Sequence, residues 1–117
     1  MARYRVRQIV FDVNQLDPMV DFWLAALAYE LDHRTAEYAV LRDRDDVEPR
    51  VFLQLVSDTK AGKNRAHVDI EVPDEQETVD RLVGLGARVL WREDSPPYHW
   101  TVLADPEGNE FCVGYFG

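Results

Sequence analysis

Hydrophobic residues recur along the chain at two helical stretches. The first predicted helix starts at Asp17-Pro18, because aspartate caps helices and proline is favoured at the first helical position. Its buried stripe, at positions i, i+3, i+4 and i+7, consists of Val20, Trp23, Leu24 and Leu27. The second predicted helix follows Asp74 and ends near Gly86, a residue that accepts the left-handed conformation. Its stripe consists of Val79, Leu82 and Val83.

Short runs rich in β-branched and aromatic residues predict eight strands. They span residues 6–13, 29–33, 37–42, 50–56, 66–72, 88–92, 100–104 and 110–115. Both halves of the chain therefore read β-α-β-β-β, and an offset of 59 residues places Val13 on Val72. We expect an α+β fold of two tandem βαβββ modules within one domain, 1–117. Module one covers about 1–58, the linker about 59–65, and module two about 66–117.

Strand alternation assigns the faces of the expected sheets. The side chains predicted to meet the helices are Ile9, Phe11, Val13, Val51, Leu53, Leu55, Val68, Ile70, Val72, Phe111, Val113 and Tyr115. Those left for the opposite faces include Gln8, Asp12, Phe52, Gln54, His67, Asp69, Glu71, Glu110 and Cys112. The 59-residue offset superposes Gln8 on His67, and an offset of 58 superposes Gln54 on Cys112. We therefore expect these four side chains at one level, as in a ligand site with pseudo-twofold symmetry.

Charge and composition exclude several classes of function. Thirteen basic and 22 acidic residues give 117 residues a net charge of −9, which disfavours nucleic acid and anionic membrane surfaces. No apolar run is long enough for a membrane span, and the N-terminus lacks the apolar stretch of a signal peptide. Cys112 is the single cysteine, so an intrachain disulfide is impossible. We expect a cytoplasmic protein.

The order of elements and two motifs resemble a known superfamily. Gly62-Lys63-Asn64-Arg65 leads into a strand containing His67 and Asp69, and the last two strands flank Asp105-Pro106-Glu107-Gly108-Asn109. Together these features resemble the vicinal oxygen chelate superfamily, which comprises glyoxalase I, bleomycin-resistance and extradiol dioxygenase proteins. The small glyoxalase-like domain group is the nearest match. The resemblance covers essentially the whole chain and implies a cup built from two modules, usually within a homodimer.

The resemblance also implies positions for a metal. Metal-dependent members bind one divalent ion with side chains from the first, fourth, fifth and last strands, positions that hold Gln8, Gln54, His67 and Cys112 here. Only His67 is of the type that glyoxalase-type enzymes use there. Amides are poor ligands for a dication, so we expect no metal and no other cofactor.

Two functions remain open. The first is a metal-independent small-molecule-binding protein of the bleomycin-resistance type, which holds a cationic or hydrogen-bond-rich ligand in an acidic cup. The second is a lyase or isomerase in which His67 acts with Asp69 or Glu110 as acid and base, with or without a weak metal. The residues expected to bind the ligand are Gln8, Phe52, Gln54, His67, Asp69, Glu110 and Cys112. Trp91, Tyr98 and Trp100 are further candidates for an apolar lining, while a linker contact between an anion and Lys60, Lys63 or Arg65 is the weaker possibility.

Overall fold

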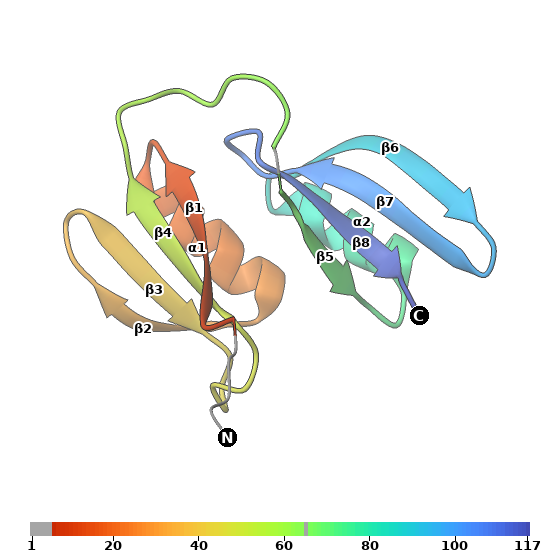
Figure 1. The fold of residues 1–117 in the computed structure, drawn as a ribbon, viewed down its shortest axis with the longest axis horizontal. Helices are drawn as coiled ribbons and strands as arrows, with labels where there is room; N and C mark the ends of the chain where they lie inside the picture. Colours follow the sequence, from red (N-terminus) through yellow and green to blue (C-terminus); the bar gives the residue numbers. More distant parts are fainter. Residues whose placement is uncertain (1–5, 65) are drawn as a thin grey trace. The chain divides into compact units, whose positions relative to one another are not determined.

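A computed structural model of the chain describes residues 6–64 and 66–117. Its elements follow the expected order β-α-β-β-β twice (Figure 1). The first half contains β1 (Gln8–Val13), α1 (Leu16–Leu27), β2 (Glu30–Arg34), β3 (Tyr38–Arg42) and β4 (Arg50–Leu55). The second half contains β5 (Val68–Glu71), α2 (Glu75–Gly84), β6 (Arg88–Ser95), β7 (Tyr98–Ala104) and β8 (Glu110–Tyr115). The prediction of an α+β fold with two tandem βαβββ modules is confirmed.

The chain divides into two compact units, Met1–Thr59 and Lys60–Gly117. Each contains one four-stranded sheet, in the order β1-β4-β3-β2 in the first unit and β5-β8-β7-β6 in the second. The first and last strands of a unit pair in parallel, and the remaining neighbours pair antiparallel. One helix packs on one face of each sheet, which leaves the other face open (Figure 1).

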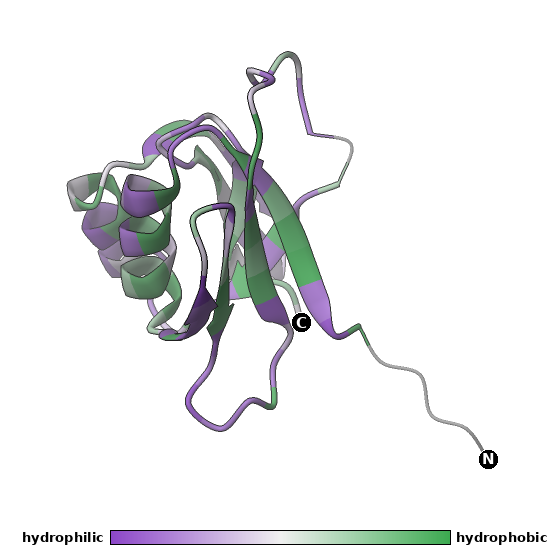
Figure 2. Ribbon diagram, turned by 90° about the vertical axis from the view of Figure 1, so that its left-hand side faces the viewer, coloured by the Kyte–Doolittle hydropathy of each residue, from purple (hydrophilic) through white to green (hydrophobic). Residues whose placement is uncertain are grey.

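Each unit has its own hydrophobic core between helix and sheet. In the first unit the Phe11 and Trp23 rings stack with centroids 5.1 Å apart, above Leu41 and Leu53, which are fully buried. In the second unit Leu82 of α2 is buried together with Leu103 of β7 and with Phe111 and Val113 of β8. The alternation of hydrophobic and hydrophilic residues that produces these faces is visible in Figure 2. No helix in the described part of the chain is long and apolar enough to cross a membrane.

The helix ends differ in part from the predictions. The prediction that Asp17 caps α1 is wrong, because the cap residue is Gln15 and Asp17 lies inside the first turn, where its charge complements the helix dipole. Asp74 does cap α2, since its carboxylate accepts a hydrogen bond from the Glu77 backbone N–H at 2.9 Å. Gly86 has the expected positive φ of 114°, whereas Ala28 holds the corresponding left-handed turn after α1 at φ 56°.

Three side chains predicted to be buried are exposed. Leu55 and Tyr115 are 41% and 42% exposed, because each is the last residue of its strand and has strand neighbours on one side only. Val83 is 47% exposed, since α2 buries only the narrower stripe that contains Val79 and Leu82. Residues 1–5, part of the N-terminus predicted to lack a signal peptide, and Arg65, one of the linker residues considered for an anion contact, lie outside the described residues.

A β-bulge occurs at the same place in both sheets. The register shifts between Leu31 and His33 in β2, and between Val89 and Trp91 in β6. Simple alternation would place Val89 and Trp91 on one face. Instead Val89 pairs with Leu103 on the helix face, and Trp91 pairs with Val102 on the open face. The bulges thus turn the second half of each edge strand towards the open face.

The register also defines which residues of the two units correspond. One row of open-face positions crosses the first sheet as His33, Val40, Phe52 and Val10, and the second as Trp91, Val102, Cys112 and Asp69. The expected superposition of Gln54 on Cys112 is therefore wrong, because Phe52 occupies that place.

Gln54 corresponds instead to Gly114, since Gln54 pairs with Tyr38 and Gly114 pairs with Trp100. Gln8 pairs with Arg50, whereas Gln54 pairs with Asp12. Gln8 and Asp12 are four residues apart on β1, which is about 13 Å along the strand. The expected common level of Gln8 and Gln54 is wrong for this reason.

Candidate functional site

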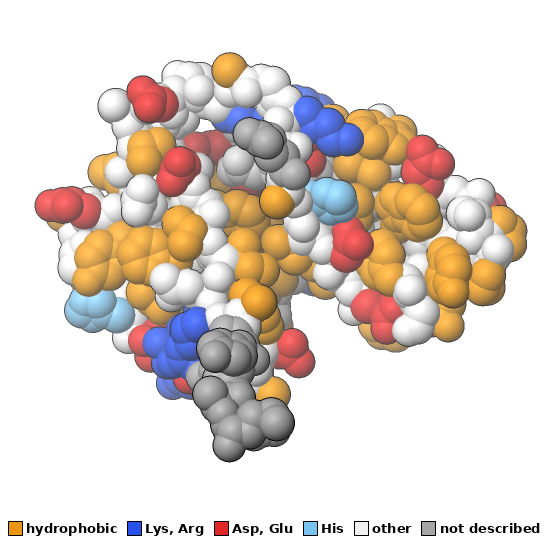
Figure 3. Space-filling model, viewed as in Figure 1, with side chains coloured by type: hydrophobic (Ala, Val, Ile, Leu, Met, Phe, Trp, Pro, Cys, Tyr) orange, Lys and Arg blue, Asp and Glu red, His pale blue; other side chains and the backbone are white. Residues whose placement is uncertain are grey.

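A pocket of about 330 Å³ lies in the open face of the second sheet. Its lining comes from all four strands, the linker and the C-terminal segment. It consists of Lys63, Asn64, His67, Asp69, Trp91, Glu93, Trp100, Val102, Glu110, Cys112 and Phe116. Figure 3 views this face, where hydrophobic side chains gather among acidic and basic ones.

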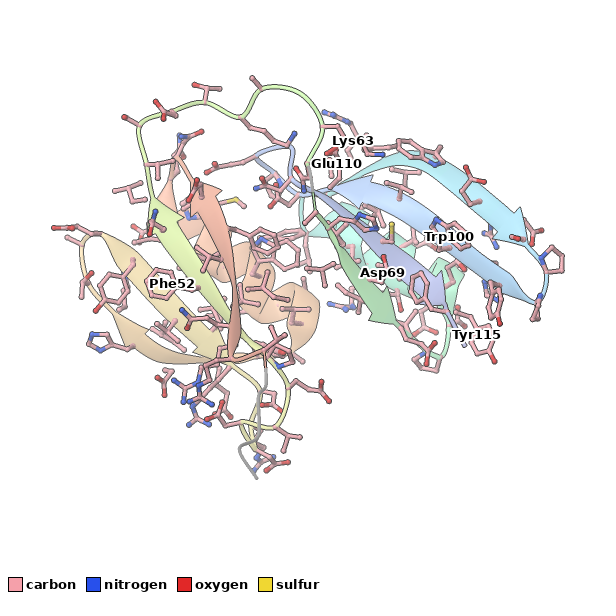
Figure 4. The ribbon with its side chains drawn as sticks, in the orientation of Figure 1. Phe52, Lys63, Asp69, Trp100, Glu110 and Tyr115 are labelled. Carbon is pink, nitrogen blue, oxygen red and sulfur yellow. The ribbon has the colours of Figure 1, made fainter. Side chains whose placement is uncertain are left out.

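Aromatic side chains form the walls of the pocket. Trp91 reaches the open face because of the bulge in β6, and Trp100 extends from β7 with its ring 6.2 Å from that of Phe116 (Figure 4). Cys112 on β8 is small and lines the pocket beside these rings, whereas Gly114 lies directly against the β7 backbone. A Cβ atom at Gly114 would lie 2.2 Å from the His99 carbonyl oxygen, so the chains approach too closely for any larger residue.

Three polar groups meet at the pocket: His67 directly before β5, Asp69 on β5 and Cys112 on β8. His67 Nε2 lies 3.1 Å from Asp69 Oδ1, and donor atoms of His67, Asp69 and Cys112 all lie within 4.8 Å of one another. Burial, the charge of Asp69 and a hydrogen bond to it raise the pKa of the Cys112 thiol to about 11. The thiol is therefore protonated at neutral pH and is a poor nucleophile.

The side chains of this protein do not fit the divalent ion that metal-dependent members of the superfamily bind. His67 and Asp69 could ligate a cation, but a thiol whose pKa is raised would first have to lose its proton. The two positions on β1 and β4 hold neutral amides, and the Gln54 amide nitrogen donates to Asp12 Oδ1 at 3.4 Å.

Glu110 holds the linker beside the pocket. Its carboxylate accepts a hydrogen bond from the Asn64 backbone N–H at 2.7 Å, and its carbonyl oxygen accepts one from the Asn64 amide at 3.0 Å. The Lys60 ammonium lies 3.6 Å from the same carboxylate. Because these contacts neutralise and orient Glu110, its role in the pocket is to position residues 60–64 (Figure 4).

The structure brings together four of the seven predicted site residues, namely His67, Asp69, Glu110 and Cys112. Gln8, Phe52 and Gln54 lie in the first unit, where Phe52 stacks on Tyr38 with centroids 5.0 Å apart. Of the additional aromatic candidates, Trp91 and Trp100 line the pocket and Tyr98 does not.

Sequence reasoning missed five lining residues: Lys63, Asn64, Glu93, Val102 and Phe116. Lys63 was considered only as part of an anion-binding loop. Glu93 was missed because the predicted strand ended at Arg92, and the bulge that orients it has no clear sequence signal. The pairing of β7 with β8 places Val102 beside Cys112, which alternation along β7 would have indicated.

A second polar cluster lies on the helix face of the same sheet. Glu75 is buried, and its carboxylate lies 2.5 Å from His99 Nδ1 and accepts a hydrogen bond from the Thr101 hydroxyl at 2.7 Å. Burial alone would raise the pKa of Glu75, but these two hydrogen bonds and the nearby Arg92 charge lower it. The cluster borders a groove of about 440 Å³ and joins the start of α2 to β7.

Comparison with known proteins agrees with this architecture. The chain resembles a glyoxalase/bleomycin resistance protein/dioxygenase family enzyme from Burkholderia phytofirmans PsJN, with 18% identity, a TM-score of 0.74, and coverage of 95% of this chain and 98% of that one. It also resembles the fosfomycin resistance protein FosX from Listeria monocytogenes, with 11% identity, a TM-score of 0.82 and coverage of 99% and 96%.

At these identities the structural likeness shows the fold alone. No curated protein sequence matches the chain. The model of the glyoxalase-like domain family, however, matches residues 8–114, which is nearly the whole chain. The chain therefore belongs to the glyoxalase-like domain family, within the vicinal oxygen chelate superfamily.

Proposed function

We propose that this protein binds a small organic molecule in the pocket of the second unit, without a metal, as bleomycin-resistance proteins sequester a ligand. The observation that carries the proposal is the combination of aromatic walls with the His67–Asp69 pair in one concave site. Apolar pockets with a few convergent polar groups are typical of small-molecule sites, and 330 Å³ lies near the lower end of their range of about 300–1,000 Å³.

Tryptophan fluorescence tests this proposal directly. Trp91 and Trp100 line the pocket, whereas Trp23 is buried in the core of the first unit and provides a constant background. A screen of cationic and aromatic natural products should yield compounds that quench the emission. Replacement of Trp91 and Trp100 by phenylalanine should remove the quenching. Quenching that persists in this double variant would place the ligand elsewhere.

The polar end of the pocket is tested by Asp69→Asn. This change should weaken a bound cationic ligand by about 1–3 kcal/mol, because a charge-assisted hydrogen bond is lost. Asp45→Asn removes the same charge from an exposed loop and should have almost no effect. Titrations of both variants should therefore differ. Equal losses would show that the pocket has been misassigned.

Metal independence needs its own measurement. The proposal is that the purified protein contains no stoichiometric divalent ion, because the amides and the protonated thiol are poor ligands. Elemental analysis of the purified protein checks this. About one zinc, nickel or iron per chain that disappears in His67→Ala would contradict it.

The distance between His67 and Asp69 favours one alternative function. A carboxylate 3.1 Å from an imidazole nitrogen can fix the orientation of the ring, as in general acid–base catalysis. A lyase or isomerase would use this pair to move a proton on the bound ligand. Incubation of protein and ligand in D₂O, followed by NMR, should then show deuterium incorporation that His67→Gln abolishes while binding is retained.

We also propose a homodimer. The sheets have exposed edge strands, and apolar side chains such as Val10, Leu31 and Val89 are about half exposed. Pairing across a twofold axis would cover them. Light scattering at micromolar concentration should give twice the chain mass of 13.6 kDa, and a mass of one chain would exclude the dimer.

A further inference from the structure

The linker places a cation on one aromatic wall of the pocket. The Lys63 ammonium lies 5.5 Å from the centre of the Trp91 ring, a distance at which the ring face attracts a positive charge. The neighbouring residue Asn64 is fixed to Glu110 by two hydrogen bonds, so the linker holds the lysine at the pocket. The pocket thus contains a cation that belongs to the protein itself.

Glu93 supplies a negative charge on the same side. Glu93 on β6 pairs with Trp100 on β7. It is the next residue of β6 after Trp91 that lies on the open face. Within residues 6–64 and 66–117 the Glu93 carboxylate makes no hydrogen bond and no ion pair, whereas Asp69 contacts His67 and Glu110 contacts Asn64 and Lys60. Among the described carboxylates of the lining, Glu93 is therefore the one without an intramolecular partner, and a cationic ligand can pair with it without breaking an existing contact.

We propose that the ligand of this pocket is an organic ammonium ion on an apolar body, which displaces Lys63 from Trp91 and pairs with Glu93. The inference rests on the proposed function and names its ligand class. Two indole faces and a carboxylate form the arrangement that recognises alkylated ammonium groups. An anion of the same size would meet Asp69 and Glu93 and would gain only Lys63 as a partner. The flexible lysine side chain can move aside, because its charge has no carboxylate partner among the described residues.

Three probes of one shape and different charge test the inference. They are 4-(trimethylammonio)benzyl alcohol, its neutral carbon analogue 4-tert-butylbenzyl alcohol, and the anion 4-tert-butylbenzoate. Calorimetric titration of the full-length protein should show the ammonium probe binding about tenfold more tightly than the neutral probe, and the anion most weakly. The preference should decrease as salt is added, because ions screen the attraction.

Two substitutions test whether Glu93 and Lys63 determine the affinity for the ammonium probe. Glu93→Gln should weaken the ammonium probe about five- to tenfold and leave the neutral probe unchanged. Glu77→Gln removes an equal charge from the exposed face of α2 and should change neither affinity. Lys63→Met should strengthen the ammonium probe about three- to fivefold, because the internal competitor is gone.

The outcomes separate the ligand class from the proposed function. If the neutral probe or the anion binds as tightly as the ammonium, the pocket binds ligands and the proposed function stands, but the cation class is overturned. If none of the three probes binds at millimolar concentration, the cation class is also overturned, and the proposed function then depends on the fluorescence screen. A weaker ammonium affinity in Lys63→Met would overturn the role of Lys63 as a competitor.

Discussion

The open faces of the two sheets share one row of positions but carry different side chains. In the first unit the central position holds Phe52, whose ring stacks on Tyr38 and covers the sheet. In the second unit the same position holds Cys112, and Gly114 stands next to it where the first unit has Gln54. The pocket of the second unit lies beside Cys112, at the position where the first unit has the larger Phe52, and Gly114 allows β7 to approach β8 closely.

The bulges show a similar contrast. The residue that the bulge turns to the open face is His33 in the first unit and Trp91 in the second. His33 lies against Tyr38, whereas Trp91 forms a pocket wall. The same backbone plan thus supports a covered face in one unit and a binding site in the other. Side-chain size at a few register positions decides which one results.

The largest expected effect concerns the close approach at Gly114. Gly114→Ala should destabilise the protein by about 3 kcal/mol, because the new Cβ would lie 2.2 Å from the His99 carbonyl oxygen and 2.6 Å from the Trp100 Cα. Urea unfolding measures the change. The corresponding residue of the first unit provides the control, since Gln54→Ala alters an exposed side chain and should change stability by less than about 0.5 kcal/mol. Similar costs in both units would contradict the register.

A smaller effect is expected for Glu75, the first residue of α2. The first residue of α1 is Leu16, which has no carboxylate. Glu75→Gln should cost about 2 kcal/mol at pH 7, because a buried charged acceptor for His99 and Thr101 is lost. The pKa of Glu75 is lowered from 4.5 in the folded protein. Its contribution is therefore complete above pH 4.5 and decreases as the pH falls through the folded-state value.

Unfolding measured between pH 7 and pH 3 checks this prediction. The difference between the natural chain and Glu75→Gln should shrink below pH 4.5. A difference that stays constant over this range would show that the carboxylate charge does not contribute.

The smallest expected effect lies at the turns after the two helices. The second unit has Gly86 at positive φ, whereas the first has Ala28 at φ 56°. Ala28→Gly should stabilise the protein by about 1 kcal/mol, because alanine is strained in the left-handed region. Ala25→Gly, inside α1, should instead destabilise it by about 0.5–1 kcal/mol. Thermal unfolding of both variants would reveal the opposite signs, and a loss of stability in both would refute the strain.

The sequence predicted the elements and most faces of the sheets because hydrophobic spacing depends on neighbours along the chain. His67, Asp69, Glu110 and Cys112 were assigned to one site in this way. The predicted correspondence of Gln54 with Cys112 is wrong because it was taken from a shift of the sequence along itself. The pairing between strands defines the register, and it places Phe52 at that position. The contacts of Glu75 with His99 and of Lys63 with Trp91 join residues far apart in the sequence, and no local pattern indicates them.

The parallel pairing of the first and last strand in each unit has a consequence for folding kinetics. Val10 meets Phe52, and Asp69 meets Cys112, only after the intervening helix and strands have been brought together. The antiparallel strands that follow each helix are joined by short connections and can pair early. Docking of β1 onto β4, and of β5 onto β8, is then the late step in each unit. The amide hydrogens of β1 and β5 should accordingly exchange with solvent faster than those of β3 and β7.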